Sequence, residues 1–211
     1  MRRSLARYRE MRDFDATPEP SGTPRRERAS ASISEAGIFV VQRHEATRLH
    51  FDFRLELDGV LVSWAVPREP SMSVGVRRLA VRTEDHPREY AQFHGAIPEG
   101  QYGAGHVQIW DRGTWRPVGD PREGLERGHL KFDLDGDRLR GRFVLIRMKS
   151  RGERQENWLL IRERDAQHVA TPPTPRTRAA RATPRTARKQ TAAGSDDMAS
   201  RRERVTRRRP S

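Results

Sequence analysis

The chain contains no cysteine, and no apolar stretch in it approaches the ~18 residues that a membrane-spanning helix needs. The lack of cysteine excludes disulfides, zinc fingers, thiolate metal sites and a cysteine nucleophile. Any bound metal ion would therefore be held by histidine and carboxylate side chains. The first residues, MRRSLARYREMRDF, also lack the apolar core of a secretory signal. We expect a protein without membrane contact that is located in the cytoplasm.

Hydrophobic residues are scarce as well, and the charge is unevenly distributed. They make up 34% of the 211 residues, and the formal net charge is +13. Twelve basic and three acidic residues lie between positions 171 and 211, whereas residues 33–170 carry 22 basic and 21 acidic ones. A segment this polar cannot bury enough apolar surface to offset its ordering entropy. We therefore predict three parts: a polar N-terminal arm (1–36), one β-domain (37–167) and a disordered basic C-terminal tail (168–211).

The basic tail has two interpretations. It is either a solvating extension or a segment that binds nucleic-acid phosphates without sequence preference. Arginine clusters recur at positions 201–202 and 207–209, and these favour the second interpretation. That interpretation predicts DNA as a partner and an association with the nucleoid.

The central region has the pattern of β-strands. Residues 48–57 alternate strictly between polar and apolar side chains, which is typical of a strand with one face in a core. Asp58-Gly59 is a strong signal for a two-residue hairpin turn. Further strands are predicted at Ile38–Arg43, Val60–Val66, Leu79–Thr83, Gly105–Trp110, His129–Leu134, Arg142–Met148 and Trp158–Glu163. Seven or eight short strands, with only one helical turn expected near Leu5–Arg12, favour an all-β barrel or sandwich.

The polar face of the 48–57 strand carries the most informative chemistry. Residues two apart on a strand share a face, so His50, Asp52 and Arg54 point the same way. His44 supplies a third ligand if the chain turns back near residues 45–47. Two imidazoles and one carboxylate suit Mn²⁺, Fe²⁺ or Zn²⁺ and leave positions open for water and substrate. Arg54 beside such a cation predicts an anionic substrate, because its planar fork suits a phosphate or carboxylate.

The same alternation is also typical of an amphipathic strand whose polar face is merely solvated. A second cluster favours the site: Glu84, His86 and Tyr90 follow another predicted strand and offer a carboxylate, an imidazole and a hydroxyl. Residues 97–105, IPEGQYGAG, form either a wide hairpin loop or a close approach for a nucleic-acid strand. They lack the Lys-Ser/Thr pair of a Walker loop.

Another arrangement of histidines suggests a different enzyme class. His50 and Asp52, followed by His106 and then Arg116, mimic the facial triad and anion-binding arginine of Fe(II)/2-oxoacid oxygenases. That reading leaves His44, Arg54 and the 84–90 cluster without a role. A non-catalytic nucleic-acid-binding β-barrel is the remaining alternative.

Five segments, in order along the chain, resemble the 3′-phosphoesterase domain of bacterial DNA ligase D and its stand-alone relatives. They are YREMRDFDATPEP (8–20), FVVQRHEATRLHFDFRLELDGVLVSWAVPREPS (39–71), RLAVRTEDHPREYAQFHGAIPEGQYGAG (78–105), VQIWDRGTW (107–115) and ENWLLIRERD (156–165). The resemblance implies a small closed or partly open β-barrel and a Mn²⁺-dependent enzyme, with other divalent transition metals as alternatives. It also implies that 3′-terminal ribonucleotides and 3′-phosphates are removed at DNA breaks to leave a 3′-hydroxyl.

The resemblance implies roles for individual residues. The family's metal ligands correspond to His44, His50 and Asp52, and its phosphate-contacting residues to Arg54 and His86. Further catalytic, nucleic-acid-binding or supporting positions correspond to Gln42, Glu84, Tyr90, Arg78, Arg68, Arg12, Asp13 and Glu19.

Two details of this correspondence matter for the reaction. Arg68 stands where relatives often carry lysine, and the two residues are not interchangeable. His86, or Tyr90 near it, is expected to protonate the leaving 3′-oxygen. Because no ligase domain accompanies these segments in the chain, we expect a ligase to act in trans on DNA or RNA–DNA 3′ ends.

Overall fold

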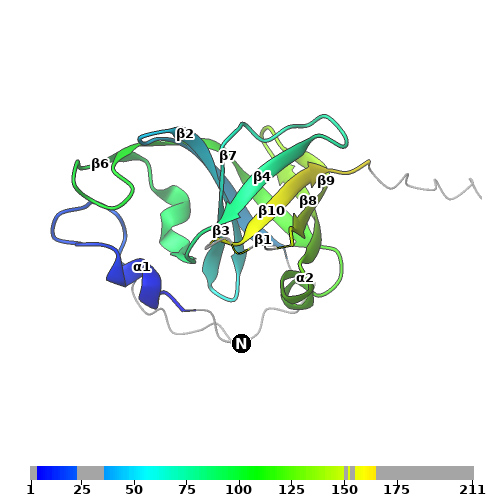
Figure 1. Ribbon diagram of the computed structural model, residues 1–211, viewed down its shortest axis with the longest axis horizontal. Coiled ribbons are helices and arrows are strands. Elements are labelled where there is room, and N and C mark those ends of the chain that lie inside the picture. Colours follow the sequence, from blue (N-terminus) through cyan, green and yellow to red (C-terminus); the bar gives the residue numbers. More distant parts are fainter. Residues whose placement is uncertain (1–3, 23–35, 150–151, 153–154, 165–211) are drawn as a thin grey trace, which may run out of the picture. The chain divides into compact units, whose positions relative to one another are not determined.

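The computed structural model describes residues 4–22, 36–149, 152 and 155–164 (Figure 1). The predicted tail at 168–211 lies outside the described residues, so its disorder stays a prediction. The described part is almost entirely antiparallel β-sheet with short helices, which confirms the predicted all-β class. Among the described helices, none is long and apolar enough to cross a membrane.

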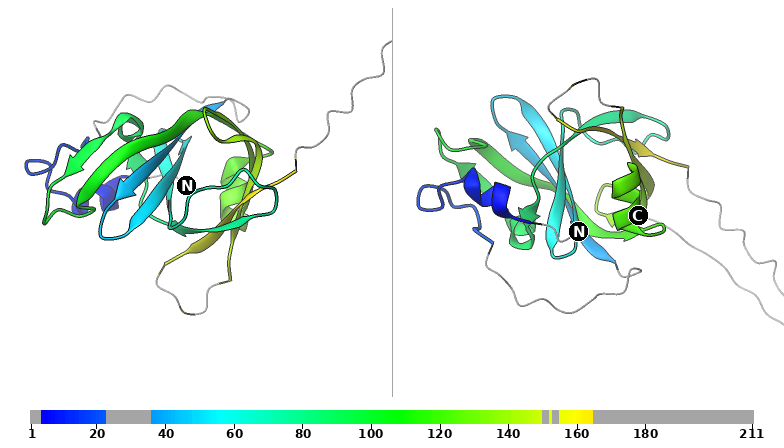
Figure 2. Two further views of the ribbon diagram at one scale, coloured as in Figure 1. Left: turned by 90° about the horizontal axis from the view of Figure 1, so that it is seen from above. Right: turned by 60° about the horizontal axis from the view of Figure 1, so that its bottom comes forward.

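Eight strands close into a barrel. Hydrogen-bonded neighbours follow the order β1-β2-β3-β4-β10-β9-β8-β7, and β7 pairs with β1 to complete the ring. Closure leaves no free edge on these strands, and Figure 2 shows the ring from two further directions. The bounds are β1 Gly37–Glu45, β2 Leu49–Leu57, β3 Val60–Val66, β4 Arg77–Arg82, β7 Gly105–Pro117, β8 His129–Gly136, β9 Arg140–Arg147 and β10 Asn157–Arg162. The predicted barrel is confirmed, and the sandwich alternative is wrong.

Short elements accompany the barrel. They are α1 (Ala6–Glu10), β5 (His86–Pro87), η1 (Arg88–Gln92, a 3-10 helix), β6 (Gly95–Ile97) and α2 (Pro121–Arg127). The helical turn predicted near Leu5–Arg12 is confirmed by α1. The prediction missed α2, whose signals are local: the Asp120 side chain caps its N-terminus and Gly128 ends it at φ 74°. The strand predicted at Gly105–Trp110 runs on to Pro117.

The alternation in β2 separates two buried layers. Phe51, Phe53 and Leu55 point into the barrel and join its main apolar core. The polar residues point outward, yet Asp52 is only 7% exposed and Arg54 only 2%. The alternative of a merely solvated polar face is therefore wrong. The polar face is buried because a second layer of side chains covers the outside of this strand.

The cover comes from the N-terminal arm and from the segment after β4. A second apolar cluster, outside the barrel, contains Tyr8 of α1, Leu61 of β3, Tyr90 and Phe93 from the η1 region, Ile97 and Val107. Figure 2 shows α1 beside η1, on the outside of the barrel. Tyr8 is fully buried, and its hydroxyl donates to the carbonyl of Pro20 at 2.7 Å. Residues 4–22 of the predicted arm are thus packed against the barrel.

The role of Tyr8 as the anchor of the arm can be tested. Removing a buried aromatic side chain costs about 3 kcal/mol, so Tyr8→Ala should open residues 5–19 locally and speed their amide exchange roughly 100-fold. Barrel amides should keep their wild-type protection in a hydrogen-exchange experiment. Glu10→Ala, an exposed position on the same helix, is the matched control. Unchanged exchange in the Tyr8 variant would contradict this anchoring.

Candidate metal and phosphate site

Three predicted ligands meet where β1 and β2 pair. His44 lies directly opposite His50 in the ladder, and Asp52 follows two residues later on β2. His44 Nδ1 is 3.4 Å from one Asp52 carboxylate oxygen, and His50 Nε2 is 3.8 Å from the other. One ligand atom from each of the three side chains lies within 4.8 Å of the other two. Ligand atoms this close to one another can bind a single metal ion.

Hydrogen bonds to the backbone orient both imidazoles. His44 Nε2 donates to the carbonyl of Gly103 at 2.9 Å, and His50 Nδ1 donates to the carbonyl of Arg48 at 2.9 Å. A carbonyl oxygen only accepts, so the nitrogen facing it carries the proton. The other nitrogen of each neutral ring then presents its lone pair toward Asp52. Such outer hydrogen bonds are what metal-binding histidines normally have, so these residues fit a divalent metal ion.

Arg54 stands next to the three ligands with one donor unused. Its Nη2 is 3.2 Å from Asp52 Oδ2, and its Nε donates to Gln42 Oε1 at 2.8 Å. Its Nη1 is buried and finds no acceptor among the described residues. An orphaned buried donor is costly. An anion bound beside the ligands would supply the missing acceptor.

Gln42 and Tyr90 hold this guanidinium in place. The Gln42 amide nitrogen donates to the carbonyls of Tyr90 (3.0 Å) and Phe93 (2.8 Å), so its oxygen is turned toward Arg54. The guanidinium carbon of Arg54 lies 4.8 Å from the centre of the Tyr90 ring. The side chain is thus fixed before any anion arrives.

The charges around Asp52 keep it ionised. Burial alone would raise the pKa of this carboxyl group, but the charged surroundings, with the Arg54 guanidinium foremost, outweigh burial and hold the pKa of Asp52 well below its ordinary value. The carboxylate is therefore available as a ligand throughout the neutral range.

His86 begins β5, and its ring lies between Tyr8 of the arm and Tyr90 of η1, at 5.0 Å and 4.8 Å. Its Nδ1 donates to the carbonyl of Glu84 at 2.9 Å, which leaves Nε2 as an acceptor 3.3 Å from Arg12 Nη2. Burial, followed by the positive charges of Arg54 and Arg12, lowers the pKa of His86 well below its ordinary value. The imidazole is therefore neutral in the free protein.

The arm contributes a buried carboxylate and a buried arginine to this cluster. Glu19 accepts from Arg12 Nε at 2.9 Å and from the Tyr90 hydroxyl at 2.9 Å. Arg12 also contacts Glu84 at 3.2 Å. Burial raises the pKa of Tyr90 above its ordinary value, and its hydroxyl proton is engaged by Glu19. This arrangement makes Tyr90 a positioning residue and gives no support to its predicted role as proton donor.

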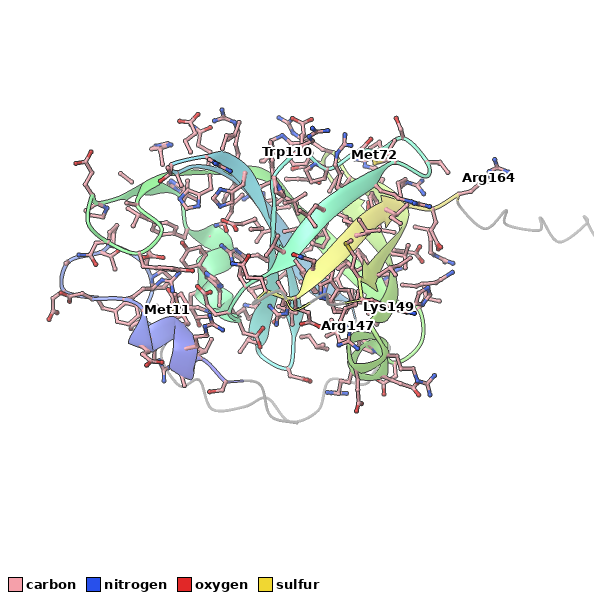
Figure 3. All side chains as sticks on the ribbon, viewed as in Figure 1. Met11, Met72, Trp110, Arg147, Lys149 and Arg164 are labelled. Atoms are coloured by element: carbon pink, nitrogen blue, oxygen red, sulfur yellow. The ribbon has the colours of Figure 1, made fainter. Side chains whose placement is uncertain are left out.

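Three further residues implied by the family resemblance have other surroundings, and their roles stay predictions. Arg78 Nε donates to the Glu69 carbonyl, and its side chain lines a surface hollow of about 360 Å³ together with Trp110 and Met72. Figure 3 labels Trp110 and Met72 at that end of the barrel. Arg68 is exposed in the β3–β4 connection. Asp13 is also exposed and accepts from the Asp15 amide at 3.1 Å, which is a turn contact.

The histidine and arginine of the oxygenase alternative are not at the site either. His106 and Arg116 both lie on β7 and are exposed. Among the described residues, the one group with metal-ligand geometry is His44, His50 and Asp52. The facial triad that would need His106 is therefore not formed.

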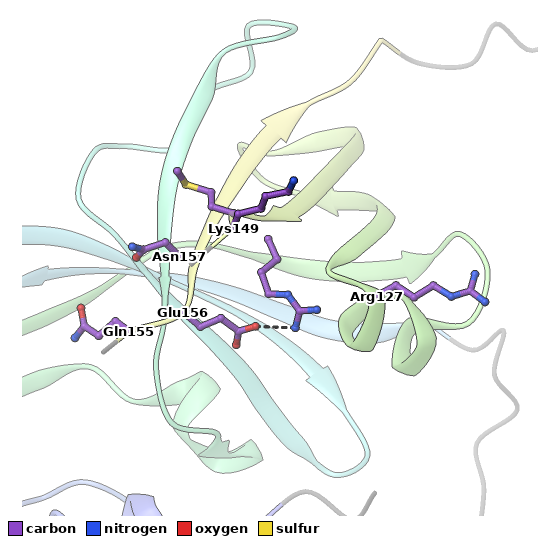
Figure 4. A pocket seen from close by; sticks show the side chains of 7 residues that line it. Arg127, Lys149, Gln155, Glu156 and Asn157 are labelled. Atoms are coloured by element: carbon purple, nitrogen blue, oxygen red, sulfur yellow. Dashed lines mark hydrogen bonds and ion pairs between the residues drawn. The ribbon is translucent and has the colours of Figure 1, made fainter. Parts of the chain in front are cut away.

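Another surface hollow holds none of the predicted residues. It measures about 480 Å³ and is lined by Arg127, Arg147, Met148, Lys149, Gln155, Glu156 and Asn157 (Figure 4). Arg147 is paired with Glu156 at 3.0 Å, as the dashed line in Figure 4 marks.

Sequence reasoning gave no role to two tyrosines that border the site. The Tyr8 ring lies 5.0 Å from the His86 ring and 4.0 Å from the Arg12 guanidinium carbon. Tyr102 lies 5.3 Å from the same guanidinium carbon. Tyr8 and Arg12 are four residues apart, a helical spacing within an otherwise polar arm, and this signal was available in the sequence. For Tyr102 only the IPEGQYGAG loop could have attracted notice.

Comparison with known proteins gives a consistent result. A model of the family described as the DNA Ligase D 3′-phosphoesterase domain matches residues 42–147. The multifunctional non-homologous end joining protein LigD of Pseudomonas aeruginosa is 54% identical over 163 residues, covering 77% of this chain and 19% of that protein. The corresponding DNA repair protein of Mycobacterium tuberculosis is 48% identical over 161 residues, with 75% and 19% covered.

A third relative, the LigD protein of Mycolicibacterium smegmatis, is 41% identical over 176 residues, covering 78% of this chain and 21% of that protein. The chain thus spans about a fifth of the length of these relatives. The family match begins at Gln42 and includes every predicted metal ligand. With this match and these identities, the resemblance found in the sequence is confirmed, and the chain belongs to the family of DNA ligase D 3′-phosphoesterase domains.

Proposed function

We propose that this chain is a divalent-metal-dependent phosphoesterase that heals DNA 3′ ends. It removes 3′-terminal ribonucleotides and 3′-phosphates to leave a 3′-hydroxyl, with Mn²⁺ as the metal. The observation that carries the proposal is the orphaned Nη1 of Arg54, buried beside the His44, His50 and Asp52 cluster. The family and its end-joining relatives support the substrate class.

The formal charges of the site explain why a metal is needed. Glu19, Asp52 and Glu84 contribute −3, while Arg12 and Arg54 contribute +2, so the linked cluster carries −1 with neutral histidines. A phosphate group would be repelled by that balance. A divalent cation held by His44, His50 and Asp52 reverses it to +1 and, when bound, polarises a phosphoryl oxygen as a Lewis acid.

Among the protein side chains, Arg54 contacts the phosphate most directly. Its Nη1 donates to a phosphate oxygen, while Gln42 and Asp52 keep the guanidinium fixed. Because the donor is already placed, it stabilises the charge on the phosphoryl oxygens without reorganisation. In the hydrolysis of a 3′-phosphate, water attacks phosphorus and loses a proton to solvent, the bond from phosphorus to the 3′-oxygen breaks, that oxygen takes up a proton, and inorganic phosphate leaves.

His86 has to change protonation to assist this step. In the free protein its Nε2 bears no proton and accepts from Arg12. A phosphate anion beside Nε2 offsets the positive charges that lower the pKa of His86, so the ring takes up a proton and donates to phosphate. His86 is then the residue from which we propose that the leaving 3′-oxygen receives its proton.

The wider setting is part of the same proposal. Substrates are DNA or RNA–DNA 3′ ends, at which the 2′-hydroxyl distinguishes a ribonucleotide from a deoxyribonucleotide. The basic tail would add salt-dependent DNA affinity. A ligase would then seal the healed end, in the cytoplasm near the nucleoid.

The metal assignment predicts the loss of all hydrolysis on removal of one ligand. In His50→Ala and in Asp52→Ala, release of phosphate from a primer–template with a 3′-phosphate should fall more than about 100-fold, since outer-shell partners alone are worth about 10- to 100-fold. Removal of a 3′-terminal ribonucleotide should fall equally. Mn²⁺ affinity, followed by calorimetry, should fall in parallel while the circular dichroism of the barrel is kept.

His106→Ala is the matched control, because this exposed histidine on β7 offers the same side chain outside the cluster. It should match the wild type in both assays. Mn²⁺-dependent phosphate release by either ligand variant at the wild-type rate would exclude the assignment. A wild type that binds 3′ ends and releases no phosphate with any metal would instead be a non-catalytic nucleic-acid-binding barrel.

A neutral, buried His86 also predicts how stability depends on pH. Because its folded-state pKa is lowered, the unfolded state binds the proton more readily, and the free energy of unfolding falls as pH decreases below about 6.5. His86→Gln keeps an acceptor for Arg12 and cannot be protonated, so its stability should fall less between pH 7 and pH 5. Urea titrations of the metal-free proteins measure this, and identical pH dependence would show that His86 is not buried in its neutral form.

A further inference from the structure

Tyr102 is an exposed aromatic side chain at the border of the site. It lies in the loop of residues 98–104 between β6 and β7, and 45% of it is accessible to solvent. The next residue, Gly103, holds the imidazole of His44 through its carbonyl oxygen. Gly105, where β7 begins, has φ 145°, and a Cβ there would meet the Glu45 carbonyl at 2.3 Å. The close crossing of β7 and β1 thus ties this loop to the metal ligands.

The ring of Tyr102 is held against a fixed partner. The guanidinium carbon of Arg12 lies 5.3 Å from its centre and 4.0 Å from the centre of the Tyr8 ring. The same guanidinium reaches His86 and Glu84. Arg12 is therefore packed against two aromatic rings, one buried and one exposed. Aromatic rings on which bases stack, together with cation–π contacts from arginine, are typical of sites that bind single-stranded nucleic acids.

The proposed substrate would bring a nucleobase near this ring. A phosphate fixed between Arg54 and His86 is covalently joined to the 3′-terminal nucleoside, whose base can reach no further than one nucleotide length. Arg12 contacts His86 directly, and Tyr102 contacts Arg12, so a single guanidinium stands between the exposed ring and His86. An exposed aromatic face at this distance suits a nucleobase, which is planar and stacks without regard to its identity.

We propose that Tyr102 stacks on the base of the 3′-terminal nucleotide and so recognises a nucleoside rather than phosphate alone. The inference rests on the proposed function and names the second group that the site binds. It predicts dependence on the presence of a base and little dependence on which base it is. Tyr102 acts here as a binding residue, and the reacting atoms remain with Arg54, His86 and the metal ligands.

The test compares two DNA 3′-phosphate ends that differ only in their last nucleotide. One carries a normal base and the other a tetrahydrofuran abasic analogue, and both are hydrolysed with Mn²⁺ by the full chain. Tyr102→Leu should lower kcat/KM on the base-bearing end about 5- to 100-fold, mainly by raising KM, because the loss of base stacking on one aromatic ring weakens binding by about this factor. The abasic end should be hydrolysed at the wild-type rate.

Tyr102→Phe is the matched control, because it keeps the ring and should behave as the wild type on both ends. A purely structural role of Tyr102, acting through Gly103 and His44, would lower the rates on both ends equally and weaken Mn²⁺ binding. Equal losses on the two ends would therefore overturn the inference. So would a leucine variant that keeps wild-type kcat/KM on the base-bearing end.

A second measurement separates this inference from the proposed hydrolysis. A 3′-phosphate DNA with 2-aminopurine as its last base should lose fluorescence on binding to wild-type protein in the presence of Ca²⁺, and Tyr102→Leu should abolish that loss. Quenching by a wild type that hydrolyses neither end with Mn²⁺ would support the stacking while the proposed function fails. Hydrolysis without quenching and without preference for the base would refute the stacking alone.

Discussion

The site depends on an ion pair buried on the outer face of a barrel strand. Asp52 and Arg54 are almost inaccessible to solvent, and burying two charges is expensive unless other hydrogen bonds compensate. Gln42 supplies one such bond, and the two imidazoles surround the carboxylate. The compensation is incomplete, since Arg54 Nη1 has no acceptor in the described part of the chain. A folded protein that leaves this donor unsatisfied is prepared for an anion.

The N-terminal arm makes that burial possible. Tyr8 fills the second apolar cluster, while Arg12 and Glu19 extend the charged network from Asp52 and Arg54 toward His86 and Tyr90. The electrostatics of the site therefore depend on the packing of the arm. If the arm opened, water would screen these charges and the pKa of His86 would return toward its ordinary value.

Much of this could be predicted from local patterns. The alternation of residues 48–57 placed His50, Asp52 and Arg54 on one face, and Asp58-Gly59 marked the hairpin that the structure contains. Helix α2 was missed because seven residues give little periodicity, although Asp120 and Gly128 mark both of its ends. The family resemblance supplied Arg12 and Glu19, whose contacts with Glu84, His86 and Tyr90 span 71 to 74 residues in sequence. Arg78 was grouped with them, and the structure places it at the end of the barrel instead.

By itself, the sequence determined the strands, the hairpin turn and the residue types of the candidate metal cluster, because periodicity and turn chemistry are properties of neighbouring residues. Only the tertiary structure decided that the polar face of β2 is buried, that His86 is neutral, and that Tyr102 stands beside Arg12. The physical reason is that burial and charge at one residue depend on what packs over it. Here the covering segments come from residues roughly 30 to 40 positions before and after β2.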